Sequence, residues 1–371
     1  MGSCVSKSSS HTPETNSSET PLFTNTIYRI PALIYINHDQ TLLAFAEKRT
    51  SLNDADATLL VMRRGTQQNG SVQWSSVQEL TTARLDKYRT MNPCPVYERQ
   101  SKTVFLFFNC VFGKVSERDQ ISKRKNQARL CHVTSRDSGQ TWSDVTDLTE
   151  SVIGNEMKNW ATFSVSPGHG IQMNDGRLII PAYVYYIHCL VVKPYAFAFY
   201  SDDGGATWHY GRRVSVQSTE CQMAEITKDD GKSSLYCNAR GNKSCQNHRV
   251  EAVSKNRGVD FETFSQKLVE LPYGCQGSVV SFQHGGKTCL LFSHTTDKKK
   301  RKDLGVYLNM TPDKVSGWKK PHIINPGVSG YSDMTRRGEE EERFACLMER
   351  GTTDLEEIAF KEFSLHEIMN N

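Results

Sequence analysis

The sequence lacks any run of eighteen consecutive apolar residues, so it offers no segment long enough to cross a membrane as a helix. Residues 1–20 also lack the apolar core of a secretory signal. Charge of one sign is not in strong excess, because 45 basic residues face 41 acidic ones and the net charge is +4. So small an excess argues against a nucleic-acid-binding protein, in which basic residues usually concentrate on one face.

The eleven cysteines lie singly along the chain, without a CxxC pair. An odd and scattered set fits neither a disulfide framework nor a tetrahedral zinc site. Several stand inside apolar runs such as FLFFNCVF and KTCLLF, where a thiol behaves as a small hydrophobic side chain. This pattern predicts a protein of a reducing compartment.

The first residues, MGSCVSK, match the N-myristoylation pattern, with Gly2 after the initiator Met and Ser6 and Lys7 further on. Cys4 is then well placed for S-palmitoylation. One myristoyl chain binds membranes only weakly, so stable attachment needs the second chain or a basic patch. The pattern predicts a tail, residues 1–20, that attaches the protein to membranes from the cytosolic side and leaves a cytosolic pool. The alternative is a flexible Ser/Thr-rich tail that matches by chance.

From residue 21 onward the chain has short β-branched or aromatic runs bounded by Gly, Asn, Asp or Ser, and little helical periodicity. The octapeptides at 135–142 and 201–208 both read S-x-D-x-G-x-T-W, and 254–261 is a degenerate third copy. Each copy is typical of a hairpin turn with an aromatic residue beneath it. Their acid positions, 137, 203 and 256, are 66 and 53 residues apart, which is the size of a four-stranded blade. The sequence therefore predicts an all-β protein, a six-bladed β-propeller with Asp-box turns over residues 21–371.

The motifs YRIPAL, MNPCP, ATFSVSPGHGIQ, IIPAYVYY, GCQGSVVSF, DLGVYLN and GYSD, together with the Asp boxes, resemble the animal exo-α-sialidases (neuraminidases). The resemblance extends from about residue 21 to the C-terminus, and it is greatest to the plasma-membrane-associated ganglioside sialidases. It implies a retaining exo-α-sialidase that acts on gangliosides, oligosaccharides and glycoproteins. Because carboxylate binding and proton transfer need neither a metal nor an organic cofactor, none is expected.

Sialic acid carries a carboxylate on its anomeric carbon, and planar guanidinium groups bind a carboxylate through two parallel charge-assisted hydrogen bonds. The resemblance assigns this role to Arg29 in YRIP, to Arg240 at the end of LYCNAR and to Arg301 before DLGVYLN. Clustered arginines repel one another, so one of them should be held by an acid. The resemblance assigns Glu349, in CLMER, to orient Arg29.

A carboxylate nucleophile would be repelled by the carboxylate of the substrate, and a neutral tyrosine avoids this. Tyr331 in GYSD matches the nucleophile of the family, and a phenol of pKa near 10 needs a base. Glu220 matches that base, with Glu225 as the competing candidate. Asp54 matches the acid/base group, five residues after Arg49, and Asp56 is the alternative nearby.

The remaining contacts to the sugar carried over from the family are weaker, because buried tyrosines more often belong to the core. They are Arg49, Asn92, Glu117, Tyr183, Tyr185 and Gln276. The basic run at 298–302 resembles a nuclear localisation signal, although a solvated loop that attracts anionic glycans or lipid head groups is the simpler interpretation.

Two other classes compete with hydrolysis. A catalytically inactive propeller could bind sialylated ligands as a lectin, and a propeller of the sortilin or kelch kind could serve protein interaction alone. An interaction propeller has no reason to keep three arginines together with an acid, a glutamate and a tyrosine, whereas a lectin could lose the acid or the tyrosine. All six residues are present, so hydrolysis is favoured, and trans-sialidase activity would differ only in the acceptor site.

Overall fold

The computed structural model describes residues 19–228, 230–241, 247–264, 268–312, 317–338 and 342–370. The predicted acylation sites, Gly2 and Cys4, lie outside these ranges. Within the described residues, no helix is long and apolar enough to cross a membrane.

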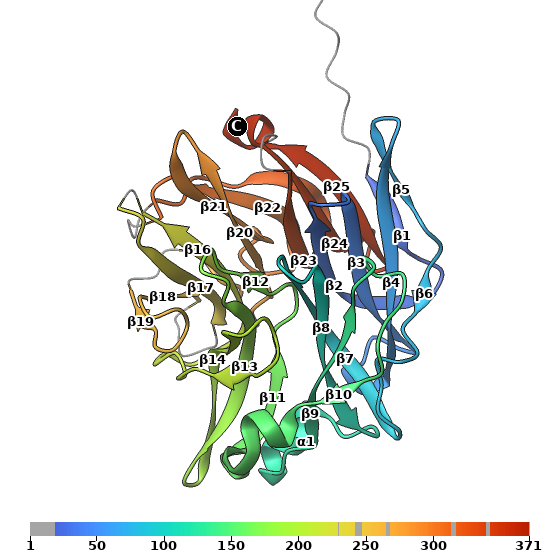
Figure 1. The fold of residues 1–371 in the computed structure, drawn as a ribbon, viewed down its shortest axis with the longest axis vertical. Coiled ribbons are helices and arrows are strands. Elements are labelled where there is room, and N and C mark those ends of the chain that lie inside the picture. The colour runs from blue at the N-terminus through green and yellow to red at the C-terminus, as the bar shows by residue number, and fades with distance from the viewer. Residues whose placement is uncertain are drawn as a thin grey trace, which may run out of the picture.

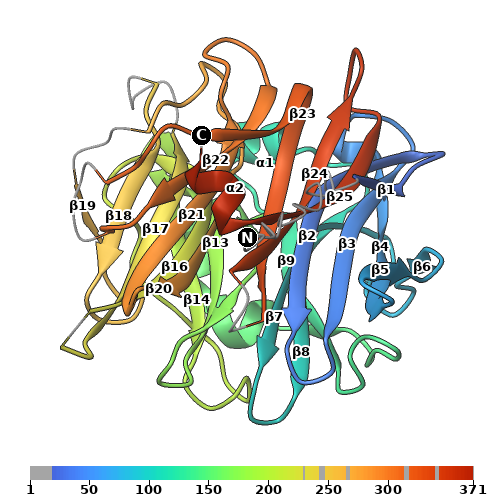
Figure 2. The same cartoon turned by 90° about the horizontal axis from the view of Figure 1, so that it is seen from above.

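The described chain forms six antiparallel blades arranged in a ring (Figures 1 and 2). The first blade contains β2 (Ile27–Ile36), β3 (Thr41–Arg49), β4 (Ala57–Gln68), β5 (Ser71–Trp74) and β6 (Gln78–Glu79). The second contains β7 (Tyr88–Glu98), β8 (Thr103–Phe112), β9 (Ala128–Ser135) and β10 (Thr146–Asp147). The third contains β11 (Trp160–Val165), β12 (Ile171–Gln172), β13 (Leu178–His188), β14 (Val191–Ser201) and β15 (His209–Tyr210).

The second half of the ring completes the predicted six-bladed propeller. The fourth blade contains β16 (Ser218–Thr227), β17 (Ser233–Gly241), β18 (Val250–Ser254) and β19 (Glu262–Thr263). The fifth contains β20 (Ser278–His284), β21 (Lys287–Thr295), β22 (Lys302–Asn309) and the first part of β23 (His322–Arg337). The sixth contains the rest of β23 with β24 (Arg343–Gly351), β25 (Glu357–Ser364) and β1 (Thr20–Phe23).

Short helical segments lie between or after the strands. They are the 3-10 helix η1 (Asp54–Asp56), α1 (Glu117–Lys123), the π-helical η2 (Thr149–Ile153), the 3-10 helix η3 (Gly154–Asn159) and α2 (Leu365–Met369).

The last two blades share a strand, and the N-terminal strand closes the ring. The strand β23 pairs with β22 over its first part and with β24 over its second, so it passes from the outside of the fifth blade to the inside of the sixth. The N-terminal strand β1 pairs with β25 and forms the outer edge of the sixth blade. Because an unpaired sheet edge invites association with other chains, this pairing both covers the edge of β25 and closes the ring.

Blades pack face to face, so the strands in the middle of each blade are buried on both sides. β8, with the sequence TVFLFFNCVF, is buried at all positions but its last, and it packs against the first and third blades. A strand buried on both faces needs no polar alternation, which explains the continuous apolar run. The core consists of apolar layers between neighbouring blades.

The first two Asp-box turns share one hydrogen-bonding pattern, and in the third Asn256 takes the place of the acid and accepts from the backbone amide of Asp260. Asp203 accepts hydrogen bonds from the backbone amide of Thr207 at 2.8 Å and from its hydroxyl at 2.6 Å, and Ser201 accepts one from the amide of Gly205. Trp208 then packs on Phe105 and Phe107 of the preceding blade, with ring centroids 5.8 and 4.6 Å away. Each turn therefore closes a hairpin and also joins its blade to the one before it.

We predict that Gly205→Ala destabilises the fold much more than Gly204→Ala. Both glycines have positive φ (+94° and +68°), which costs an alanine about 1–2 kcal/mol. A Cβ at Gly205 would lie 2.3 Å from the Phe105 ring, whereas a Cβ at Gly204 would meet no atom within 4 Å. Overpacking should add about 1–3 kcal/mol at Gly205 alone. Thermal unfolding of the two variants checks this, and equal midpoints would contradict it.

Candidate active site

The predicted site residues gather at one mouth of the ring, on the face that carries loops 50–56, 113–127, 189–190, 296–301 and 352–356. We call it the site face. In Figure 1 it is the lower end, where α1 and the tip of the β13–β14 hairpin lie, whereas the C-terminus lies at the upper end. Antiparallel blades return every second strand to the same face, so residues far apart in sequence end there together. A cavity of about 460 Å³ opens on this face, lined by Glu117, Tyr183, Tyr185, Pro194, Thr219, Glu220, Arg240, Gly241, Pro272 and Tyr273.

The centre of the site is a hydrogen-bonded pair of Tyr331 on β23 and Glu220 on β16. The phenol donates to a carboxylate oxygen of Glu220. Arg240 on β17 donates from one nitrogen to Glu220 at 2.8 Å and to the phenol oxygen at 3.1 Å. Burial and the negative charge of Glu220 raise the pKa of Tyr331 well above 10, against the opposing effect of Arg240. The phenol is therefore neutral at rest and contacts the base that can take its proton.

Three guanidinium groups surround Tyr331, and we call them the arginine triad: Arg29, Arg240 and Arg301. Besides the hydrogen bond from Arg240, the guanidinium carbons of Arg29 and Arg301 lie 5.6 and 5.3 Å from the centre of the Tyr331 ring. Arg301 also donates to the carbonyl of Gly274 at 3.0 Å. The structure therefore brings these three arginines, which come from different blades, together around Tyr331.

Glu349 on β24 is a fully buried carboxylate with four hydrogen bonds. Arg29 donates two, at 2.6 and 3.1 Å, and the backbone amides of Ile30 and Tyr331 donate one each at 2.9 Å. Burial favours the neutral acid, but the charge and hydrogen bonds of Arg29 outweigh it, so the pKa of Glu349 is lowered. The carboxylate thus orients Arg29, as the resemblance implied, and it also fixes the backbone at Tyr331.

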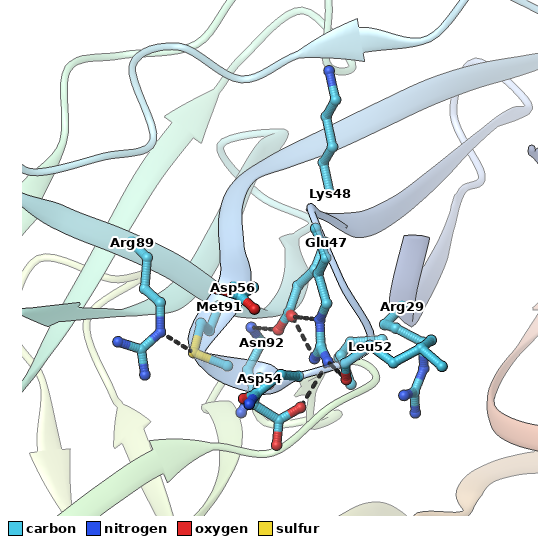
Figure 3. Close-up of polar contacts among 12 residues, drawn as sticks. Arg29, Glu47, Lys48, Leu52, Asp54, Asp56, Arg89, Met91 and Asn92 are labelled. Carbon is cyan, nitrogen blue, oxygen red and sulfur yellow. Dashed lines mark hydrogen bonds and ion pairs between the residues drawn. The ribbon is translucent and has the colours of Figure 1, made fainter. Parts of the chain in front are cut away.

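Asp54 lies on the rim of the site at the start of η1, which Asn53 caps through its side chain. Arg49, at the end of β3, donates to Asp54 at 2.6 Å, and the side chain of Asp54 is 78% exposed (Figure 3). The alternative acid, Asp56, instead accepts from Lys114 and Ser51. The geometry therefore leaves the carboxylate of Asp54 open to a ligand and commits that of Asp56 to neighbouring side chains.

Glu225, the competing partner for Tyr331, lies further along β16. Its carboxylate accepts from the backbone amide of Asn174 at 2.8 Å and is separate from the Tyr331 phenol, which bonds to Glu220. The structure thus distinguishes the two glutamates of the ECQMAE segment by position.

Sequence reasoning missed Glu47, which binds Arg49 and, through Arg49, positions Asp54. This fully buried residue on β3 accepts from Arg49 at 2.7 and 2.9 Å and from the backbone amide of Asn92 at 2.6 Å (Figure 3). Burial raises the pKa of Glu47, against the opposing charge of Arg49. The available signal was an acid directly after the apolar run TLLAFA, two residues before Arg49 and on the same strand face.

Glu117 and two tyrosines form another wall of the cavity. Glu117 is the first residue of α1, whose N-terminus Ser116 caps, and Tyr183 on β13 points its hydroxyl at the Glu117 carboxylate, 3.4 Å away. Tyr185 lies edge-on to Tyr183. Glu117 is exposed, but many protein atoms surround its carboxyl group. The resulting desolvation and the repulsion from Glu220 raise the pKa of Glu117. This wall therefore presents a weakly acidic carboxyl and two aromatic rings.

Two predicted sugar contacts are buried. Asn92 donates from its side-chain amide to Ser164 at 2.5 Å, and its backbone amide donates to Glu47 (Figure 3). Gln276 donates to the carbonyls of Ser332 and Pro167 and accepts from the amide of Ser332 at 3.0 Å. With both ends of its amide engaged, Gln276 supports the strand next to Tyr331 and does not face the cavity, contrary to the role expected from the resemblance.

Comparison with known proteins defines the class. Residues 40–341 match the model of the BNR repeat-like domain. The chain is 46% identical to Sialidase-3 of Bos taurus, covering 93% of this chain and 91% of that protein, and 44% identical to Sialidase-2 of Mus musculus, covering 91% and 92%. The chain therefore belongs to the animal sialidase family and is an exo-α-sialidase, a glycoside hydrolase.

Solved structures share the fold at lower identity. The Hadza microbial sialidase Hz136 superposes with a TM-score of 0.75 at 21% identity, over 92% of this chain and 66% of that one. A Trypanosoma rangeli sialidase in complex with 2,3-difluorosialic acid, described as a covalent intermediate, gives 0.72 at 16% identity, over 95% and 59%. These likenesses support the propeller fold. Among the described residues, no cluster of three or more His, Cys, Asp or Glu could hold a metal ion.

We predict that Glu349→Gln lowers the stability at neutral pH by about 3 kcal/mol, because it leaves Arg29 buried without its counter-charge. The folded-state pKa of Glu349 is below its usual value of 4.5, so its contribution is present above that pH and is lost as the pH falls further. The stability difference between wild type and variant should therefore shrink below pH 4.5. Denaturant unfolding across this range measures it, with the exposed Glu356→Gln as control. A difference that stays constant with pH would contradict the assignment.

Proposed function

We propose that this sialidase removes terminal sialic acid from gangliosides and other sialylated glycoconjugates with retention of anomeric configuration. The observation that carries the proposal is the neutral Tyr331 phenol, hydrogen-bonded to Glu220 inside the arginine triad. The arginines supply a site for the carboxylate of the substrate, and the phenol supplies a nucleophile that this carboxylate does not repel. The 46% identity to Sialidase-3 supports the sialidase activity, and the motif resemblance to ganglioside sialidases supports a ganglioside substrate.

The reaction follows two steps. The arginine triad binds the carboxylate of the substrate, and Tyr331 attacks the anomeric carbon while Glu220 takes the phenolic proton. Asp54 protonates the glycosidic oxygen, so the remaining glycan departs as an alcohol. Water then attacks the same carbon as the bond from that carbon to the Tyr331 oxygen breaks. Asp54 takes a proton from the water, and the departing Tyr331 phenolate recovers its proton from Glu220. Two displacements at one carbon return the starting configuration.

The neighbours of Tyr331 explain how a weakly acidic phenol serves as nucleophile. The phenolate that forms needs cationic neighbours, and Arg240 already donates to the phenol oxygen at 3.1 Å. Arg240 also binds Glu220, so one guanidinium contacts both the donor and the acceptor of the transferred proton. Preorganised charge of this kind stabilises the transition state without further rearrangement.

Membrane attachment is the second part of the proposal. Myristoylation at Gly2, with palmitoylation at Cys4, would hold the enzyme on membranes from the cytosolic side. Two acyl chains give stable attachment, and incomplete palmitoylation would leave the cytosolic pool.

Tyr331→Phe should reduce kcat on a fluorogenic sialoside by at least about 1,000-fold, because the nucleophilic oxygen is removed. Binding of free sialic acid, measured by calorimetry, should survive because the arginine triad is intact. Glu225→Gln is the matched control and should retain turnover, whereas Glu220→Gln should lose it. Full turnover by Tyr331→Phe would refute the nucleophile assignment. If wild-type protein binds sialic acid and shows no turnover, the protein is a lectin.

Asp54→Asn should affect substrates according to their leaving group. An aryl sialoside departs without protonation, whereas a sugar alcohol needs the acid, so kcat/KM should fall more for sialyllactose than for the aryl substrate. Asp56→Asn, which removes the partner of Lys114, is the control. An equal loss on both substrates would count against Asp54 as the acid.

Gly2→Ala should shift the protein from the membrane to the soluble fraction of expressing cells, because the acceptor of the first acyl chain is lost. Turnover of a soluble sialoside should be unchanged, since the change lies outside the propeller. Fractionation followed by immunoblotting measures the shift, and Ser3→Ala is the control. Unchanged pelleting of Gly2→Ala would refute acylation.

A further inference from the structure

The site face carries the most exposed large apolar side chains of the described residues. Tyr273 is 81% exposed, Leu190 77% and Val191 54%. Leu190 and Val191 lie at the tip of the β13–β14 hairpin, which Figure 1 shows as the lowest strand pair. Tyr273 lies in the loop before β20, on the rim of the cavity. Their exposure to water is unfavourable, and a grouping of such residues on one face indicates a binding surface.

Each apolar group lies next to a run of three consecutive exposed cations. Lys123 ends α1, Arg124 and Lys125 follow it, and Arg124 donates to the carbonyl of Leu190 at 2.5 Å. We define rim patch 1 as these three cations with Leu190 and Val191. The hydrogen bond fixes the cations against the hairpin tip.

The second group repeats this arrangement. Lys298, Lys299 and Lys300 are exposed, and the next residue, Arg301, donates to the carbonyl of Gly274, which follows Tyr273. We define rim patch 2 as Tyr273 with these three lysines. One carboxylate stands close by, that of Asp297, which accepts from the backbone amides of Lys299 and Lys300 and so forms the turn itself.

The six cations are distinguished by their clustering. In the described part of the chain, none of the six forms an ion pair with a carboxylate, whereas Lys114 pairs with Asp56. Scattered exposed lysines such as Lys102 also form no ion pair, but the six occur as two runs of three beside exposed apolar side chains. Cations without a partner retain their full attraction for an external anionic surface. The combination of unpaired lysines or arginines with exposed Leu, Val and Tyr is that of proteins that lie on lipid bilayers.

The two patches adjoin different walls of the cavity. Rim patch 1 adjoins the wall formed by Glu117 and Tyr185. Glu117 begins α1, which ends at the cations, and Tyr185 lies on β13, which ends next to the hairpin tip. Rim patch 2 continues from the wall formed by Arg240 and Tyr273, since Arg240 donates to the carbonyl of Tyr273. A flat surface that contacts both patches therefore covers the mouth of the cavity.

We propose that rim patches 1 and 2 bind an anionic lipid bilayer, so that the cavity opens directly onto the head-group layer. The cations contact the anionic head groups, Leu190 and Val191 enter the interface, and Tyr273 lies at head-group depth. The proposal rests on the proposed function in one respect, the identification of the cavity as the active site. Binding of the two patches to a bilayer gives the enzyme a preference for sialic acid carried by membrane lipids over the same sugar in solution.

The test uses the full chain carrying Gly2→Ala and Cys4→Ala, so that acyl chains do not contribute. Binding is measured by flotation with vesicles of phosphatidylcholine alone and of an equal mixture of phosphatidylcholine and phosphatidylserine, both without sialic acid. The protein should bind the mixed vesicles and lose binding as salt is raised. Reversing four charges (Lys123→Glu, Lys125→Glu, Lys298→Glu, Lys300→Glu) should weaken binding at least ten-fold, because each cation near an anionic surface adds to the attraction.

The matched control reverses four exposed lysines on or near the opposite face, Lys102, Lys287, Lys319 and Lys320, and should retain binding. A Leu190→Ser, Val191→Ser variant should also bind less well. Turnover of a soluble sialoside should be unchanged in all variants, which shows that they fold. Equal loss in the control, equal binding to both vesicles, or no binding by the parent chain would overturn the proposal and leave the rim to a protein partner. Loss of turnover in the parent with intact vesicle binding would refute the proposed function alone.

Discussion

The structure depends on one buried carboxylate, that of Glu349. Its bonds to Arg29 and to the amide of Ile30 join the sixth blade to the first, and its bond to the amide of Tyr331 fixes the nucleophile strand. A buried ion pair of this kind is costly to desolvate and pays little in stability, but removal of one partner is severe. Its value here is geometric, because the same group closes the ring, aims the first arginine and positions the phenol.

Similar pairings keep the remaining charges of the site in place. Glu47 holds Arg49, which holds Asp54, and Glu220 holds both Arg240 and Tyr331. Arg29 and Arg240 are each bound by an acid on one side and keep part of the side chain exposed, whereas Arg49 is buried. The result is a site that stays cationic enough to attract a carboxylate, although several acids lie within it. Proton transfer and substrate binding therefore use one connected network.

The sequence predicted those parts of the molecule that depend on local patterns. The Asp boxes set blade length, and the resemblance placed Tyr331 and the arginine triad at their motifs. Glu47 and Gln276 were missed or misassigned because their partners, Asn92 and Ser332, come from other blades or distant strands. A carboxylate or amide in a strand does not reveal whether it faces a cavity or a neighbouring backbone. That information exists only after the blades have packed.

Ring closure also sets when the protein can first act. Glu349 and Arg29 are 320 positions apart, and Glu349 belongs to the last blade to be synthesised. Until the ribosome has translated that blade, Arg29 has no counter-charge and the second part of β23 has no strand to pair with. A nascent chain therefore remains catalytically silent through nearly all of its synthesis. Premature termination anywhere before β24 yields a product that cannot cleave sialic acid inside the cell that makes it.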